Sequence, residues 1–418
     1  MKEFALSLLK HRDARRLWSA SACISAAVWM LQTAVAVHVL DRGSPSTLAM
    51  VILAGSVPML LIMPIAGTVA DRFDVRRVAL IAMTAQTLCV AAMAAAVHAG
   101  LVVLAGLYAL HGTALAFWAP LRQQWLYAVL PRELRPRANA ALGSLNGLMT
   151  VIGAAGGGVL SAYAPVWAIG TASLLLGLGL AQLIRVAPAA PANSQQKGSG
   201  THAAITGTFR DLRDGLAVAR GLPLARSVIW IGIAWGFIGG SYPVLLAGRV
   251  ISDLHGDSVA LGLAYTLDGL SVIVATVLAG RLSPTKHLRV WAIGYGVQGV
   301  GWAGFFLAPS LPAALACLVL MRIGSGYIIA LDTTILLDSV PAHFRGRMTS
   351  VHTTTYTLMA RLSLGAIGWL LTSVSLTAVG TATGALSLVC GGVWWWRVGR
   401  KSQHLYGKRS SSDREAIT

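Results

Sequence analysis

Residues 61–85 read LIMPIAGTVADRFDVRRVALIAMTA, in which two apolar runs flank a short charged loop at 71–77. Extended outward, the runs cover residues 48–69 and 78–98, and neither contains Asp, Glu, Lys or Arg. Each run is close to the ~20 residues that a helix needs to cross the hydrocarbon core of a bilayer. A helix is expected because backbone polar groups find no water there. This stretch therefore predicts two membrane-spanning helices joined by a charged hairpin.

The same alternation continues along all 418 residues. Segments that reach or approach the spanning length occur at 17–40, 48–69, 78–98, 101–126, 138–162, 164–186, 224–248, 259–280, 290–308, 311–337, 348–371 and 375–397. The pattern predicts an all-α membrane protein with twelve transmembrane helices.

Basic residues in the loops predict the orientation of these helices. They gather in every second loop, at 10–16, 72–77, 132–137, 187–222, 281–289, 345–347 and in the tail after Arg397. The opposite loops hold only Arg42 and Arg249. By the positive-inside rule the basic side faces the cytoplasm, so we expect both termini to be cytoplasmic.

The composition excludes several other classes of protein. The net charge of +18 and the isoelectric point near 10.6 follow from these loops, and no soluble domain is left to carry a nucleic-acid-binding face. Mean hydropathy is +0.68 and only 11% of residues are charged, as in a membrane protein. No nucleotide-binding loop, metal-ligand cluster or nucleophile motif occurs, so we expect no enzyme activity, no cofactor and no bound metal.

An internal repeat divides the chain. PRELRPR at 131–137 and PAHFRGR at 341–347 lie 210 positions apart, each before a predicted helix. We expect two six-helix bundles, at 1–186 and 223–400, which is the architecture of a rocker-switch transporter. A cytoplasmic linker at 187–222, with a short amphipathic helix near its end, would join the bundles. Residues 401–418 would form a basic tail.

Several motifs resemble those of a known superfamily. Residues 67–77, GTVADRFDVRR, resemble the signature loop of the major facilitator superfamily, G-x-x-x-D-R-x-x-x-R-R. FWAPLR at 117–122, FRDLRDGLAVAR at 209–220 and RGR at 345–347 are similar to its enterobactin-exporter and macrolide-efflux branch. The resemblance implies a secondary active exporter of a siderophore-like or drug-like amphiphile, working by proton antiport in a bacterial cytoplasmic (inner) membrane. The first helix departs from the family because residues 23–32 hold no carboxylate, and Ala154 stands where the antiporter motif has proline.

Two groups of residues are expected to control the movement of the bundles. An acidic residue followed by cations makes charge-assisted hydrogen bonds, so we interpret the charged loop as a latch of the outward-open state; a plain topology signal is the alternative. This cytoplasmic gating motif comprises Gly67, Asp71, Arg72, Arg76, Arg77, Arg345 and Arg347. Small-x-x-x-small spacing predicts close helix packing, static or sliding, at Gly143, Gly147, Gly153 and Gly157.

Ionisable residues within predicted spans are the strongest functional candidates. A charge at the bilayer centre costs from ~3 to above 10 kcal/mol, so each should face a polar cavity or a partner. The expected substrate and coupling cavity comprises Gln32, His111, Arg122, Asp268, Arg322, Asp332 and Arg361. Asp332 lies 210 positions after Arg122, which suggests a pair with substrate at Arg122 and the coupling proton at Asp332. Ion pairs that only hold helices together are the alternative, and His352 is expected to be a simple hydrogen-bonding residue.

The expected partners are a small-molecule substrate, protons and membrane lipids, with no nucleic acid and a monomeric chain. Two other functions stay open. One is a lipid or metabolite carrier of the same fold, and the other is a non-transporting membrane sensor or assembly partner.

Overall fold

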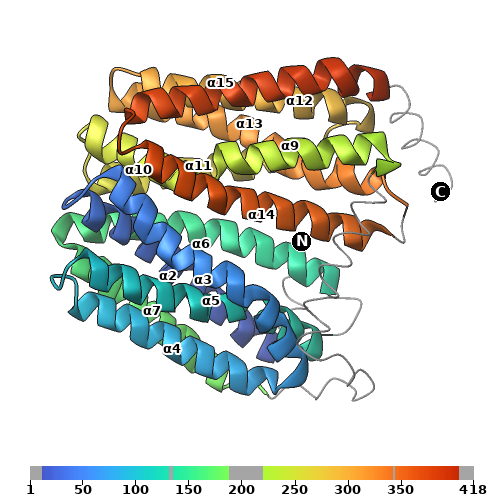
Figure 1. Cartoon of the computed structure of the whole chain (residues 1–418). Coiled ribbons are helices and arrows are strands. Elements are labelled where there is room, and N and C mark those ends of the chain that lie inside the picture. Colours follow the sequence, from blue (N-terminus) through green and yellow to red (C-terminus); the bar gives the residue numbers. More distant parts are fainter. Residues whose placement is uncertain (1–11, 131–134, 188–219, 342–343, 404–418) are drawn as a thin grey trace. The chain divides into compact units, whose positions relative to one another are not determined.

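A computed structural model of the protein describes residues 12–130, 135–187, 220–341 and 344–403 (Figure 1). Within these ranges the chain forms helices joined by turns, and no strand occurs. The predicted linker, its amphipathic helix up to residue 219, and most of the predicted basic tail lie outside the described residues.

The helices form two compact units. The first comprises residues 1–206 and 256–266, and the second comprises 207–255 and 267–418. Unit 1 contains α2 (Arg12–Leu40), α3 (Pro45–Arg72), α4 (Val75–Ala95), α5 (Leu101–Val129), α6 (Arg135–Tyr163) and α7 (Pro165–Ile184). Unit 2 contains α9 (Pro223–Gly239), α10 (Tyr242–Gly248), most of α11 (Ser258–Ala279), α12 (His287–Leu307), α13 (Leu311–Asp338), α14 (Arg345–Leu370) and α15 (Leu376–Trp394). The predicted domain boundaries stay a prediction.

The predicted fold class is confirmed, since each of the twelve apolar segments coincides with helix. The seventh segment is two helices, because α9 ends at Gly239 and α10 begins at Tyr242. Ten helical spans in the described part of the chain are long and apolar enough to cross a membrane. Two predicted spans, α12 and α14, are not among these ten. The Trp, Tyr and Gln residues of α12 lower its mean hydropathy, and α14 carries a polar face.

Helix packing in unit 1 is repeated in unit 2. In unit 1, α2 packs on α6 and α7, while α4 packs on α5 and α7. In unit 2, α9 packs on α14 and α15, while α12 packs on α13 and α15. Each of these helix pairs in unit 2 corresponds to the pair in unit 1 that lies six predicted spans earlier in the chain. The internal repeat of the sequence is therefore also a repeat of helix contacts.

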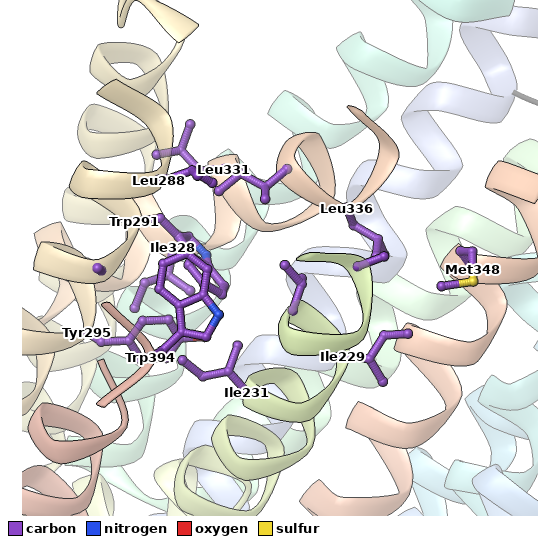
Figure 2. Close-up of a cluster of buried hydrophobic side chains, with 14 of the residues drawn as sticks. Ile229, Ile231, Leu288, Trp291, Tyr295, Ile328, Leu331, Leu336, Met348 and Trp394 are labelled. Carbon is purple, nitrogen blue, oxygen red and sulfur yellow. The ribbon is translucent and has the colours of Figure 1, made fainter. Parts of the chain in front are cut away.

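A cluster of buried hydrophobic side chains, among them the rings of Trp291, Tyr295 and Trp394, forms the core of unit 2 (Figure 2). The indole of Trp291 lies edge-on to Trp394, with 4.5 Å between ring centroids, and edge-on to Tyr295 at 5.2 Å. The Nε1–H of Trp394 donates a hydrogen bond to the Ser227 hydroxyl at 3.0 Å, which ties α15 to α9. Lipid is as apolar as these side chains, so the cluster stabilises the unit by close packing rather than by escape from water.

Glycines allow helix backbones to touch. In unit 1, a Cβ on Gly153 would meet the Ala26 carbonyl, and a Cβ on Gly157 would lie 2.9 Å from that of Met30. These two glycines therefore seat α6 against α2. A Cβ on Gly143 would meet nothing within 4 Å, so this position does not pack closely. A functional role for the four predicted glycines stays a prediction.

The crossing of α12 and α13 yields a test of this packing. In Gly324→Ala the new Cβ would lie 2.6 Å from the Gln298 backbone nitrogen and 2.7 Å from the Gly294 carbonyl oxygen. We expect a loss of stability of roughly 1–3 kcal/mol, the usual cost of overpacking. Gly296→Ala is the matched control, because its Cβ would meet only Leu388 Cδ1 at 3.5 Å. Thermal unfolding of the purified variants measures the difference, and equal Tm values would contradict the close crossing.

Candidate functional site

A cavity of about 350 Å³ lies within unit 2, between α9, α10 and helices α12 to α15. It falls in the size range of small-molecule sites, and its wall mixes aromatic and polar groups as such sites do. The aromatic and polar wall comprises Trp235, Tyr242, Trp302, Tyr356, Gln298, Ser325, Thr357, Thr383 and Ser387. Arg322 and Arg361 add two guanidinium groups.

An ion pair between Asp268 and Arg322 forms one side of the cavity. Nε of Arg322 contacts Oδ1 of Asp268, and the Tyr242 hydroxyl donates a hydrogen bond to Oδ2 at 2.8 Å. The Arg322 guanidinium carbon lies 5.0 Å from the centre of the Tyr242 ring, in cation–π range. Asp268 is only 6% exposed, so its charge depends on these partners.

Neutral polar side chains in the cavity wall are bonded to one another. The Oε1 atom of Gln298 accepts hydrogen bonds from the Trp235 indole at 3.2 Å and from Ser325 at 2.8 Å. Its Nε2 donates to Ser387 at 3.1 Å. The Trp302 indole donates to Thr383 at 3.1 Å. These bonds fix the rings against the wall.

A second acidic group, Asp332, is paired with His352. Nε2 of His352 lies 2.6 Å from Oδ2 of Asp332, within hydrogen-bond distance. The ring fits because Gly232 of α9 faces it: a Cβ at that position would lie 2.9 Å from Nδ1 of His352. Nδ1 itself has no hydrogen-bond partner among the described residues.

Tyr356 connects the Asp332–His352 pair with the cavity. It lines the cavity, lies one helical turn after His352 on α14, and stacks on Trp235 with 5.2 Å between ring centroids. The Asp332–His352 pair is therefore one helical turn away from the cavity wall along α14.

The structure brings together three of the predicted cavity residues, because Arg361 and Arg322 line the cavity and Asp268 pairs with Arg322. Asp332 does not line the cavity and is bonded to His352. The other three belong to unit 1, so the predicted pairing of Arg122 with Asp332 stays a prediction.

In unit 1, Gln32 of α2 is half-buried, and His111 of α5 is buried and stacks on Tyr108 at 5.7 Å. Arg122 is half-buried on the same helix, and its Nε atom has no hydrogen-bond partner among the described residues.

Sequence analysis gave His352 no role beyond hydrogen bonding, yet it is the partner of Asp332. The signal was present in the hairpin of α13 and α14. Asp332 lies six residues before the end of α13 at Asp338, and His352 lies seven residues after the start of α14 at Arg345. At 1.5 Å per residue the two groups reach nearly the same depth.

The predicted gating motif is described only in part. The side chains of Asp71 and Arg72, and the surroundings of Gly67, lie outside the described part of the chain. Nη2 of Arg76 donates to the Ile184 carbonyl, the last residue of α7, at 2.5 Å. Nε of Arg345 donates to the Leu337 carbonyl, in the last turn of α13, at 3.1 Å.

Cations at these helix C-termini donate hydrogen bonds to the terminal carbonyls and interact favourably with the negative end of the helix dipole. Arg77 contributes its backbone N–H, which donates to the Asp74 carboxylate at 2.9 Å, and Arg347 is exposed. The latch stays a prediction.

The profile of the Major Facilitator Superfamily matches residues 17–360, and a second match covers residues 224–416. The chain belongs to the Major Facilitator Superfamily. No curated protein matches it. Its membership and its helices make it a multi-pass membrane protein with a transporter fold.

Solved structures of other superfamily members share this fold. A D-xylose–proton symporter has a TM-score of 0.66 at 14% identity, over 91% of this chain and 96% of the other. A bacterial homologue of the iron transporter ferroportin, in an inward-facing state, has a TM-score of 0.64 at 17% identity, over 93% and 99%. The nucleoside transporter NupG has a TM-score of 0.63 at 11% identity, over 94% and 98%. At these identities the likeness concerns the fold alone.

Proposed function

We propose that this superfamily member is a secondary active exporter of an amphiphilic small molecule, which it exchanges for protons by alternating access. Membership of a transporter superfamily and a cavity of about 350 Å³ with aromatic and charged walls support this function. Export, and a place in the enterobactin-exporter and macrolide-efflux branch, rest on the motifs at 117–122, 209–220 and 345–347. The loop charges support cytoplasmic termini, and a bacterial inner membrane rests on the same resemblance to the exporter branch.

The Asp332–His352 pair carries the proposal of proton coupling. The carboxylate and the imidazole lie 2.6 Å apart, so in this proposal both take part in holding the coupling proton. The guanidinium groups of Arg322 and Arg361 line the cavity together with Tyr356, which lies one turn after His352 on α14. A substrate that enters the cavity changes the electrostatic field around these groups, so substrate and proton affinities become linked.

The remaining predicted residues receive supporting roles. Gln32, His111 and Arg122 would contact substrate from unit 1, and Asp71 would latch the outward-open state. The Asp268–Arg322 pair would stay ionised throughout the cycle, because each charge is compensated inside the protein. In this proposal Asp332 holds the coupling proton and Asp268 does not.

Transport driven by a pH gradient is the test of this function. Proteoliposomes with an acidic lumen would receive 2-naphthalenesulfonate and 2-naphthyltrimethylammonium, two amphiphiles whose fixed charges keep them from crossing lipid unaided. We expect at least one to be concentrated inside, and collapse of the pH gradient by nigericin to abolish this. Arg122→Ala in the same assay tests the contact proposed for unit 1.

The alternatives give different results in that assay. Uptake that equilibrates at the same level with and without the gradient would indicate a carrier without proton exchange. An absence of uptake of both probes would contradict transport of amphiphiles and favour a sensor or assembly partner.

A further inference from the structure

We infer that one end of unit 2, where α12 begins and α15 ends, binds the headgroup of an anionic phospholipid. The surface concerned, here called the basic corner, consists of exposed cations on two segments of the chain: Arg281, Lys286, Arg397, Arg400 and Lys401. It lies outside the cavity and is independent of the proposed transport. Four features carry the inference: the joining of the two segments, the level at which the helix ends, the charge, and the apolar surface next to it.

The basic corner is built from segments that are distant in the sequence. Residues 280–289 join α11 to α12, and residues 395–403 continue α15. Helices α12 and α15 run side by side in unit 2 (Figure 1), which brings these segments together. Leu282 of the first segment and Val398 of the second pack against the same buried cluster. The two segments therefore share one support.

A hydrogen bond also joins the segments directly. Nε2 of Gln403 donates to the Thr285 carbonyl at 3.2 Å. Arg400 lies about one helical turn before Gln403, and Lys286 follows Thr285 in the chain. The cations of both segments therefore belong to one surface, where like charges repel each other and a bound anion would compensate them.

The length of the last helix places these cations at the level of lipid headgroups. The helical stretch from Leu376 to Gln403 has 28 residues. The hydrocarbon core of a bilayer takes up ~20 residues of a helix, so the last turns extend beyond it. Arg397, Arg400 and Lys401 lie in these last turns.

The charge of the basic corner is not balanced within the protein. Every other basic loop has an acidic residue in it or next to it, such as Asp13, Asp71, Glu133, Asp211 or Asp338, whereas residues 280–289 and 395–403 contain none. None of the five cations forms an ion pair within the described part of the chain. A topology signal requires cations but does not require acids to be absent. The pattern therefore indicates an anionic partner.

An apolar surface adjoins the cations along the same helix. Val389, Val393 and Trp396 are exposed and follow one another at spacings of four and three residues, close to one helical turn each. Arg400 comes four residues after Trp396. Tryptophan is enriched where hydrocarbon meets headgroups. Acyl chains can therefore lie on the helix while the phosphate meets the cations, an arrangement that a phospholipid fits and a free phosphate ester uses only in part.

Titration of the full chain with single lipids tests this inference. The protein in a neutral detergent would receive phosphatidylglycerol or phosphatidylcholine with the same acyl chains, and native mass spectrometry would count the lipids bound. We expect the first phosphatidylglycerol to bind at least about tenfold more tightly than the first phosphatidylcholine. Glycerophosphoglycerol, the same headgroup without acyl chains, should not displace phosphatidylglycerol at an equal concentration.

Variants locate the preference. Lys286→Gln/Arg400→Gln removes one cation from each segment of the basic corner and should lose most of the preference for phosphatidylglycerol, with binding of phosphatidylcholine unchanged. Arg12→Gln/Arg185→Gln is the matched control, because it removes the same charge from exposed positions in unit 1. The control should keep the preference of the wild type.

Equal affinity of the two lipids for the wild-type protein would overturn the inference, and this comparison needs no variant. An equal loss in both double variants would also overturn it, because the net charge of the chain would then attract the lipid. Displacement of phosphatidylglycerol by the free headgroup would indicate a site for a soluble phosphate ester instead of a lipid. None of these measurements involves transport, so their outcome is distinct from failure of the proposed function.

Discussion

Asp332→Asn should abolish uphill transport and leave downhill exchange intact. Asparagine has the shape of aspartate and can still hydrogen-bond to His352, but it neither carries the charge nor takes up the proton. For one-to-one exchange with the membrane potential held at zero, each pH unit supports about tenfold accumulation, so the ratio should fall from that value to one. Accumulation of a charged naphthalene probe in proteoliposomes, with and without a pH gradient, measures this loss.

Asp338→Asn is the matched control, because it makes the same change on α13 at an exposed position six residues further along. It should accumulate probe like the wild type. His352→Gln should keep transport but lower the accumulation at a given pH gradient, because the Asp332 carboxylate loses its hydrogen-bond partner on α14. If Asp332→Asn still concentrates probe at the wild-type rate, the proton site lies elsewhere, and Asp268 would be the next residue to examine.

Arg322→Gln should destabilise the protein strongly, by about 3–5 kcal/mol, because it leaves the buried carboxylate of Asp268 without its cation. The double variant Arg322→Gln/Asp268→Asn should recover most of this loss. Its amide oxygen still accepts the hydrogen bond from Tyr242, and no uncompensated charge remains. Tm and yield of folded protein from membranes measure both effects.

Arg289→Gln on α12 serves as control, because this residue is exposed and its loss should leave Tm unchanged. A double variant that is as unstable as the single one would show that Asp268 is held by something other than its pairing with Arg322. An unaffected single variant would show that the carboxylate is already neutral in the folded protein.

The fold could be predicted from the sequence because a bilayer permits few backbone conformations in a spanning segment. A spanning segment has to be helical and of a set length, so the apolar run at 48–69 predicts α3 closely. The break in the seventh span could also have been found. Residues 239–243 read GGSYP, and proline fits best in the first turn of a helix, where Pro243 lies in α10. Hydropathy averages over such a break, which is why the prediction gave one continuous helix.

The partners of the charged residues could not be predicted in the same way. Charged residues are rare within membrane spans because a charge there costs free energy, so Asp268, Arg322 and Asp332 can be recognised in the sequence as unusual. Which of them meet depends on how far each helix is rotated about its axis, and apolar residues on every face leave that rotation unspecified. Arg322 thus meets Asp268 of α11, while Asp332 on the same helix meets His352 of α14.

Gly232 has no chemistry of its own, yet the position of the His352 ring depends on it. Any larger residue there would push the imidazole away from Asp332, and the pair would come apart without a change in either member. Gly232, Asp332 and His352 should therefore be inherited as a set. In a related transporter, a bulky residue at the position of Gly232 would mark the loss of the proposed proton site even where the acid and the histidine are both retained. On the proposed mechanism, the residue at this position separates proton exchangers from carriers that work without proton exchange.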